Sequence, residues 1–405
     1  MYRLNEAGYK AYLVGGGVRD LLLGKKPKDF DVATNATPEQ VSKIFKNCRL
    51  IGRRFRLAHI HFGREIIEVA TFRASNHIDI NSQKTDEGML LRDNVYGNIE
   101  EDAIRRDFTV NALYYNIDNF SVIDYVCGID DLNNEIIRLM GDAEVRYRED
   151  PVRMIRAVRF MTKLNFQLEQ ETENYLFRLG NLIQMVPAAR LFDEVLKLFM
   201  NGYAAKTFEN LYHYKLFKYL FPKTNNCLDN NEGKIKNTFV WQGLYNTDLR
   251  IHEEKPVTPA FLFAILLWDP VREKTMIFEQ NGLEPNKAMQ KAYTMVLDYQ
   301  LKQISIPKRF SIPMREIWGL QSRFQHTTEK KAIRFISHPR FRAAYDFLLL
   351  RTQMGEMQPE IVEWWTNFQD KNANLMQSIK NSRKKKFTRH SLSRVSKNGK
   401  KGDFK

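Results

Sequence analysis

The sequence contains few of the features that mark secreted, zinc-binding or membrane proteins. Three cysteines, Cys48, Cys127 and Cys227, occur in 405 residues, and their odd number and wide spacing exclude a disulfide framework and a cysteine-based zinc cluster. The N-terminus lacks the apolar run of a secretory signal, and the most apolar segment, 260–268, is too short to span a bilayer. We therefore expect a cytoplasmic protein in a reducing compartment, without membrane insertion.

Two familiar nucleotide-binding signatures are also missing. The chain has three consecutive glycines at 15–17, but neither the Gly-Lys-Ser/Thr of a P-loop nor the Gly-x-Gly-x-x-Gly spacing of a dinucleotide fingerprint. Glycine has no Cβ and tolerates positive φ, so a strand running into this triplet lets the backbone approach a phosphate closely. Arg19 would then hold a triphosphate oxygen. A plain turn is the alternative that the triplet alone leaves open.

Acidic residues are too few to balance the basic ones. The 63 Lys and Arg against 48 Asp and Glu leave a net charge of +15, which favours a polyanionic partner, nucleic acid before an anionic membrane surface. From Lys380 onward, eleven Lys and Arg stand against the single acid Asp403, with few apolar residues. We expect a disordered basic tail that grips RNA without reading its sequence, although such tails also serve only solubility.

The hydrophobic pattern predicts a sheet-containing part followed by helices. At 405 residues the chain exceeds a single hydrophobic core, so two or more domains are expected. Strand-like runs occur at 12–14, 57–62, 66–72 and 109–116. Apolar residues at helical spacing occupy 152–164 and 190–200, and few strand-like runs follow. The fold class is therefore α+β, with an all-α remainder.

An Asp-x-Asp pair follows the glycines. On a strand, Asp29 and Asp31 would point to one side and Phe30 and Val32 would be buried on the other. Two hard cations held there would activate a ribose 3′-hydroxyl and stabilise a leaving pyrophosphate. Such sites usually need a third carboxylate, and two candidates beside strand-like runs are Asp107 and Glu68. A solvated pair of edge aspartates is the plainer alternative.

A second polar group lies where the helical pattern begins. Glu149, Asp150 and Arg153 are placed at a helix start, where residues i and i+3 share a face. A carboxylate at 150 and a guanidinium at 153 match the Watson–Crick edges of adenine and cytosine, and reject guanine and uracil at about 1 to 3 kcal/mol per unpaired group. The pattern predicts A or C without choosing between them. A surface salt bridge is the alternative.

Five ordered motifs resemble the class II nucleotidyltransferases, which include CCA-adding enzymes and bacterial poly(A) polymerases. They are Gly-Gly-Val-Arg-Asp at 16–20, Asp-Phe-Asp-Val-Ala at 29–33, Arg-Arg-Asp-Phe-Thr-Val-Asn-Ala at 105–112, Asp-Tyr-Val-Cys-Gly at 124–128 and Arg-Glu-Asp-Pro-Val-Arg at 148–153. The resemblance implies a polymerase-β-like catalytic head with a mixed sheet at 1–141. A helical neck at 142–223, a helical body and C-terminal RNA-binding region at 224–369, and the basic tail at 370–405 would follow.

The resemblance also assigns roles residue by residue. It implies that Asp29, Asp31 and Asp107 are the catalytic carboxylates, that Asp29 and Asp31 hold Mg²⁺ or Mn²⁺, and that Glu68 is a second choice. For the substrate ATP, the implied nucleotide-binding residues are Gly16, Gly17, Arg19, Arg106, Asn111, Glu149, Asp150 and Arg153. Arg106 and Asn111 belong to the motif tied to ribose discrimination, and bracing the sheet is their alternative role. Arg190 and Glu194 are expected to anchor the neck to the head, with a base-reading contact secondary.

Other segments resemble the bacterial poly(A) polymerases specifically. These are 51–59, 90–94, 148–153 and 340–351. The resemblance implies AMP addition to RNA 3′ ends, promoting RNA processing and decay, with RNA-decay machinery as a further partner and a monomeric enzyme. Candidate RNA-binding residues are Arg53, Arg54, Arg56, Lys384, Lys385 and Lys386. CCA addition to tRNA and an inactive RNA-binding protein of the same fold are the alternatives.

Overall fold

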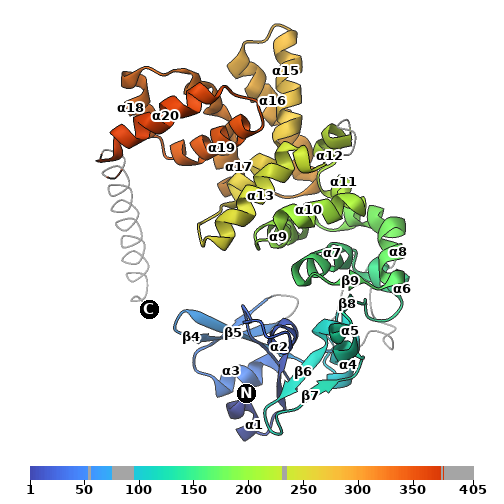
Figure 1. Ribbon diagram of the computed structural model, residues 1–405. Helices are drawn as coiled ribbons and strands as arrows, with labels where there is room; N and C mark the ends of the chain where they lie inside the picture. The colour runs from blue at the N-terminus through green and yellow to red at the C-terminus, as the bar shows by residue number, and fades with distance from the viewer. Residues whose placement is uncertain (53–55, 75–94, 230–234, 375–376, 378–405) are drawn as a thin grey trace, which may run out of the picture. The chain divides into compact units, whose positions relative to one another are not determined.

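The computed structural model describes residues 1–52, 56–74, 95–229, 235–374 and 377. These residues form two compact units (Figure 1). The first unit comprises Met1–Leu198 and Lys206–Leu220, and the second comprises Phe199–Ala205 and the described residues from Phe221 onward. The predicted division into four parts is finer than this and stays a prediction.

A seven-stranded sheet forms the base of the first unit, with the order β3-β4-β5-β2-β1-β6-β7. Neighbouring strands are antiparallel except β2 and β5, which are parallel. This mixed sheet, followed by a mostly helical remainder, confirms the predicted fold class. The strands are β1 Ala11–Val14, β2 Asp31–Thr34, β3 Cys48–Ile51, β4 Leu57–Phe62, β5 Glu65–Thr71, β6 Leu113–Asn116 and β7 Val122–Asp124.

Both faces of the sheet are covered. Val32 of β2 lies in a core with Val41 and Phe45 of the α3 region, while the next residue, Ala33, lies in a core on the other face with Tyr12 and Tyr114. Alternate residues of a strand point to opposite faces, so β2 contributes to both cores. The helices associated with the sheet are α1 Tyr2–Glu6, α2 Gly16–Leu22, α3 Pro38–Ile44, α4 Ile99–Ile104 and α5 Gly128–Asn133.

Two details of the predicted strands are wrong. Phe30 is 43% exposed rather than buried, because β2 begins only at Asp31 and Phe30 lies before the pleated segment. The run 109–116 is a strand only in its second half, since Thr109–Asn111 form a 3₁₀ turn before β6. All three residues of that turn are buried, so the alternation of apolar and polar residues there does not indicate a strand with one buried face.

From Ala143 the described part of the first unit is helical, apart from the two-residue strand β9 Gln167–Leu168, which pairs with β8 Ile136–Ile137. The helices predicted at 152–164 and near 190–200 are present. The helices are α6 Ala143–Glu149, α7 Val152–Leu164, α8 Gln170–Leu179, α9 Ala188–Phe199, α10 Ala204–His213 and α11 Phe217–Leu220.

The described residues of the second unit are helical. Trp365 is fully buried in one of its cores, together with Phe324, Phe341 and Leu348. No described helix of the chain combines the length and the apolar composition needed to cross a membrane. The helices are α12 Pro222–Asp229, α13 Phe239–His252, α14 Pro259–Leu266, α15 Trp268–Gln280, α16 Pro285–Gln303, α17 Lys308–Gly319, α18 Glu329–Ile336, α19 Phe341–Gln353 and α20 Pro359–Lys371.

Candidate active site

A row of register partners crosses the sheet and carries two of the predicted carboxylates. Along it, Tyr114 pairs with Val14, Val14 with Asp31, Asp31 with Glu68 and Glu68 with His59. Register partners on adjacent strands point to the same face, about 5 Å apart. The Asp31 and Glu68 carboxylates therefore lie side by side, and His59 Nε2 lies 3.4 Å from Glu68 Oε2 at the far side.

Electrostatic strain is concentrated at Asp31. Although the residue as a whole is exposed, partial burial of its carboxyl group and the charges of Glu68 and Asp29 together raise the pKa of Asp31 to about 6, against the opposing charge of Arg106. Asp29 is also exposed and lies in the segment before β2, not on the strand as predicted. Crowded carboxylates of this kind are stabilised by a bound divalent cation, so the donor set fits a metal.

No three His, Cys, Asp or Glu side chains among the described residues converge as a preformed metal cage. Magnesium sites in phosphoryl-transfer enzymes use one or two carboxylates and complete the shell with substrate phosphates and water. Here Asp31, together with one of its neighbours Asp29 and Glu68, would hold such an ion.

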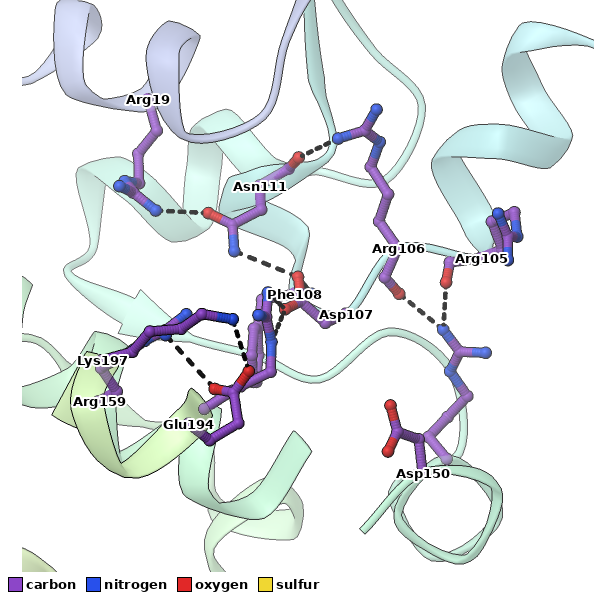
Figure 2. A network of polar contacts seen from close by, with 12 residues as sticks. Arg19, Arg105, Arg106, Asp107, Phe108, Asn111, Asp150, Arg159, Glu194 and Lys197 are labelled. Atoms are coloured by element: carbon purple, nitrogen blue, oxygen red, sulfur yellow. Dashed lines mark hydrogen bonds and ion pairs between the residues drawn. The ribbon is translucent and has the colours of Figure 1, made fainter. Parts of the chain in front are cut away.

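Asp107, predicted as a catalytic carboxylate, is held in a network of its own (Figure 2). Arg156 of α7 donates to Asp107 Oδ2 through Nε at 2.7 Å and also through a second guanidinium nitrogen, and the Asn111 amide donates to Oδ1 at 3.2 Å. Burial alone would raise the pKa of Asp107, but the charge and hydrogen bonds of Arg156 outweigh it and lower the pKa to about 2. Glu68, the second choice, is thus the one adjacent to Asp31.

The predicted phosphate-binding glycines are arranged differently from a glycine loop. Gly15 has a φ of 69°, whereas Gly16 and Gly17 already form the first turn of α2. A Cβ at position 17 would lie 3.4 Å from the carbonyl oxygen of Asp29, an ordinary van der Waals contact, so the segment before β2 packs against this turn. Gly17 therefore lies next to the segment that carries Asp29.

Arg19 is 2% exposed and is engaged within the protein. Its guanidinium donates to Asp20 Oδ1 at 2.6 and 2.9 Å and to Asn111 Oδ1 at 2.5 Å. Figure 2 shows the resulting chain from Arg19 through Asn111 to Asp107. The chain fixes the orientation of the Asn111 amide, because its oxygen accepts from Arg19 and its nitrogen donates to Asp107. A direct contact of Arg19 with triphosphate stays a prediction.

Arg106 links the sheet row to the same network. It donates from Nε to the Tyr114 hydroxyl at 2.9 Å, from one terminal nitrogen to Asp102 at 3.1 Å, and from the other to the Asn111 carbonyl at 3.3 Å. Its guanidinium carbon lies 5.0 Å from the Tyr114 ring centroid. These contacts brace the sheet, which was the alternative role, and they also keep a cation near Asp31.

The predicted base-reading residues flank a break between two helices rather than the start of one. α6 ends at Glu149, Asp150 is extended with φ −147° and ψ 92°, and α7 begins at Val152 after Pro151. Residues before proline disfavour the helical conformation, so Pro151 accounts for the break. Asp150 does not pair with Arg153; it accepts from Arg190 of α9 at 2.7 Å. The contact of Arg190 with the base-reading segment, thought secondary, is present.

Hydrogen bonds of Glu149 and Arg146 fix the segment between α6 and α7. Glu149 Oε2 accepts from Arg146 at 2.9 Å and from Arg153 at 3.1 Å, and it is 7% exposed. Arg146 also donates to the carbonyl oxygens of Arg105 and Arg106 at 2.7 and 2.6 Å. Burial, and then the charge of Arg153, lower the pKa of Arg146 to about 10. The segment that carries Asp150 is therefore tied to the segment that carries Asp107.

Sequence reasoning missed the basic face of α7. The guanidinium carbons of Arg19, Arg156 and Arg159 lie 5.3, 5.4 and 4.8 Å from the centroid of the Phe160 ring. Lys163 lies 3.5 Å from Asp20 on the same side. Burial, and then the charge of Arg156, lower the pKa of Arg159 to about 10. The spacing of Arg156, Phe160 and Lys163 at i, i+4 and i+7 was the available signal.

Six arginines and lysines were predicted to bind RNA, and the structure describes one of them. Arg53, Arg54, Lys384, Lys385 and Lys386 lie outside the described residues, as does the motif at 90–94. Arg56 is described, and its guanidinium pairs with Glu39 at 2.7 Å at an exposed position. A role of these residues in RNA binding stays a prediction.

Three stretches of the chain match known protein families. Residues 11–138 match the poly A polymerase head domain, 165–228 the probable RNA and SrmB-binding site of polymerase A, and 281–401 the polymerase A arginine-rich C-terminus. Poly(A) polymerase I of Escherichia coli is 52% identical over 377 residues, which cover 91% of this chain and 81% of the relative. The chain belongs to the poly(A) polymerase family. The resemblance read from the motifs is thereby confirmed.

CCA-adding enzymes are more distant relatives of this poly(A) polymerase family member. The CCA-adding enzyme of Lactobacillus gasseri is 40% identical over 208 residues, which cover 51% of this chain and 50% of the relative. The crystal structure of the Bacillus stearothermophilus CCA-adding enzyme in complex with CTP aligns with a TM-score of 0.62 at 25% identity, covering 92% of this chain and 80% of that one. The fold is shared, whereas similarity over nearly the whole sequence runs to the poly(A) polymerases.

Proposed function

We propose that Asp29, Asp31 and Glu68 are the carboxylates through which this chain performs the reaction of its family. That reaction is template-independent polyadenylation, in which AMP passes from ATP to the 3′-hydroxyl of RNA and pyrophosphate leaves. The observation that carries the proposal is the register of β2 and β5, which sets Asp31 beside Glu68. The raised pKa of Asp31 supports it, because a site that crowds negative charge is one that a cation stabilises.

Magnesium, or manganese in its place, would be held by these carboxylates and the nucleotide phosphates, and it would supply charge neutralisation at the α-phosphate. The protein's own groups then position the nucleotide. Arg19 orients the amide of Asn111, and Arg156 orients the carboxylate of Asp107, so the two polar side chains are presented rigidly toward a ribose. The cations of α7 favour the triphosphate over a neutral ligand.

Selection of adenine is proposed for the Asp150 segment. The carboxylate of Asp150 is a hydrogen-bond acceptor for an amino group such as adenine N6, and the ion pair with Arg190 at 2.7 Å orients it. Arg153, 11% exposed in its side chain, is fixed by Glu149 and by the Arg146 carbonyl oxygen at 2.7 Å. Because adenine and cytosine offer the same donor–acceptor order, the preference for ATP over CTP rests on the family and not on these two side chains.

Extension assays with each nucleotide test the function. Purified protein is given Mg²⁺, an unstructured RNA oligomer and one nucleoside triphosphate at a time, and long products are expected with ATP alone. The Asp31→Asn variant is expected to lose more than about a hundred-fold in rate, since several kcal/mol of charge stabilisation depend on that site. Addition of three residues to tRNA lacking its CCA end, using CTP, would replace the proposal with CCA addition. RNA binding without extension would leave a binding protein.

A further inference from the structure

The second unit contains a cavity of about 640 Å³ between α13, α14, α17 and α19, and none of the catalytic or nucleotide-binding residues proposed above lines it. Its size falls within the range of small-ligand sites, roughly 300 to 1,000 Å³. One part of the wall is apolar, and it includes the half-buried rings of Phe261 and Phe310 together with Ile317 and Leu350. Rings that are partly exposed at a cavity wall offer a stacking surface for another planar group.

Positive charge surrounds the remaining wall. Four arginines, Arg250, Arg309, Arg340 and Arg342, line the cavity, against the two acids Glu253 and Asp346. One lining acid is already neutralised from outside, because Lys255 lies 2.6 Å from Glu253. Four lining guanidinium groups against one further lining carboxylate, that of Asp346, leave an excess of positive charge that favours an anion.

The ion pairs at the cavity leave its positive charge incompletely balanced. Asp346 is shared between Arg342 at 3.0 Å and Arg250 at 3.7 Å, while Arg340 pairs with Glu316 at 3.0 Å. Among the described residues Arg309 forms no ion pair, and its guanidinium carbon lies 4.9 Å from the centroid of the Phe310 ring. An uncompensated guanidinium therefore lies directly beside an aromatic wall.

We propose that this cavity binds one nucleotide of the RNA substrate, with the base against Phe310 and the phosphate on Arg309. The inference rests on the proposed function, because RNA is the substrate of that reaction. Single-stranded RNA is bound without sequence preference where base–aromatic stacking and phosphate–arginine contacts occur together, and both elements meet at residues 309 and 310. The site provides a grip on RNA that does not involve the carboxylates of the first unit.

An acidic peptide is the rival occupant, since it would also satisfy the arginines. It would make no use of the rings that border the cavity, and the family's substrate already brings phosphates and flat bases to the protein. The two occupants differ in their response to loss of the Phe310 ring, because stacking contributes to RNA binding and not to binding of a carboxylate-rich peptide.

The test compares two cavity variants with a matched control. Phe310→Leu removes the ring and keeps apolar bulk, Arg309→Gln removes the charge, and Arg334→Gln removes an exposed arginine of α18 outside the cavity. Affinity for a fluorescent single-stranded RNA is measured by anisotropy across a salt series, without ATP. Phe310→Leu is expected to raise the Kd roughly tenfold, and Arg309→Gln to reduce the slope of log K against log salt by about 0.7. The control keeps both values, and thermal melting checks that each variant is folded.

A direct readout uses RNA containing 4-thiouridine, cross-linked and mapped by mass spectrometry. Cross-links to the peptide containing Phe310, lost in Phe310→Leu, are expected. RNA affinities of both cavity variants equal to that of the control, with cross-links elsewhere only, would overturn the proposal. So would retained RNA binding with lost binding of a hexaglutamate peptide, which assigns the cavity to a protein. The binding and cross-linking measurements use no ATP and do not depend on polymerisation. A wild-type protein that fails to polymerise would therefore refute the proposed function and leave these measurements valid.

Discussion

Asp31 and Asp107 are both aspartates of the first unit, yet their surroundings shift them in opposite directions. Asp31 stands beside Glu68 and Asp29 and has a raised pKa, whereas Asp107 is paired with Arg156 and has a lowered one. A carboxylate crowded by like charge gains by binding a cation, while one already paired with arginine gains little. Their surroundings therefore distinguish the carboxylate of Asp31, which is suited to binding a metal ion, from that of Asp107, which is suited to positioning the nucleotide.

Glu68 provides the sharpest test of that separation. Glu68→Gln is expected to reduce kcat by roughly a hundred-fold through loss of a charge beside the reacting phosphate, with little change in the melting temperature because the side chain is 42% exposed. Glu65→Gln, at an exposed position of the same strand, is the matched control. Equal kcat values for the two variants would remove Glu68 from the catalytic group.

The lowered pKa of Asp107 leads to a prediction about how the stability of the protein depends on pH. Its lowered pKa means that its contribution to stability is present above the ordinary value near 3.8 and is lost as the pH falls toward about 2. Asp107→Asn is expected to lower the free energy of unfolding by roughly 3 kcal/mol at pH 7, where Arg156 is left without its counter-charge. The deficit relative to wild type should shrink at pH 3.5 in urea titrations. Asp130→Asn, an exposed control, should show no such trend.

At the scale of elements, the break between α6 and α7 is positioned from α9. Arg190→Gln frees the carboxylate of Asp150 and is expected to raise the KM for ATP roughly fivefold, a modest effect because the arginine is 48% exposed. Lys197→Gln removes a charge from the same helix, but its partner is Glu194, so it serves as the control. A changed kcat with an unchanged KM would contradict a role in holding the base-reading segment.

Helices and strands with a clear hydrophobic period could be predicted from the sequence, whereas contacts between elements far apart in the sequence could not. β4 and α7 were predicted at their observed bounds because period-2 and period-3.6 patterns report burial on one face. Pro151 was an available signal for the break between α6 and α7, where only the start of a helix was predicted. By contrast, the pairs Asp107–Arg156 and Asp150–Arg190 join residues 49 and 40 positions apart, and no local pattern reveals such partners.

Part of the net charge of +15 of the whole molecule comes from the Lys- and Arg-rich segment that begins at Lys380. Deleting the residues from Lys380 onward is expected to weaken RNA binding and to reduce the salt slope by at least about 1, because several phosphate contacts are lost together. Selectivity for ATP should be unchanged, since the proposed nucleotide-binding residues lie before position 200. An unchanged slope after truncation would show that this segment does not bind RNA.

The hydrogen bonds of Arg146 have a consequence for engineering. Its guanidinium joins Glu149, at the end of α6, to the backbone at Arg105 and Arg106, next to Asp107. A laboratory that redesigns the 149–153 turn to accept a different base is therefore expected also to displace the groups proposed to contact the ribose, so that nucleotide preference and turnover change together. Libraries that vary positions 105–107 and 149–153 at once should yield active variants that single-site libraries miss.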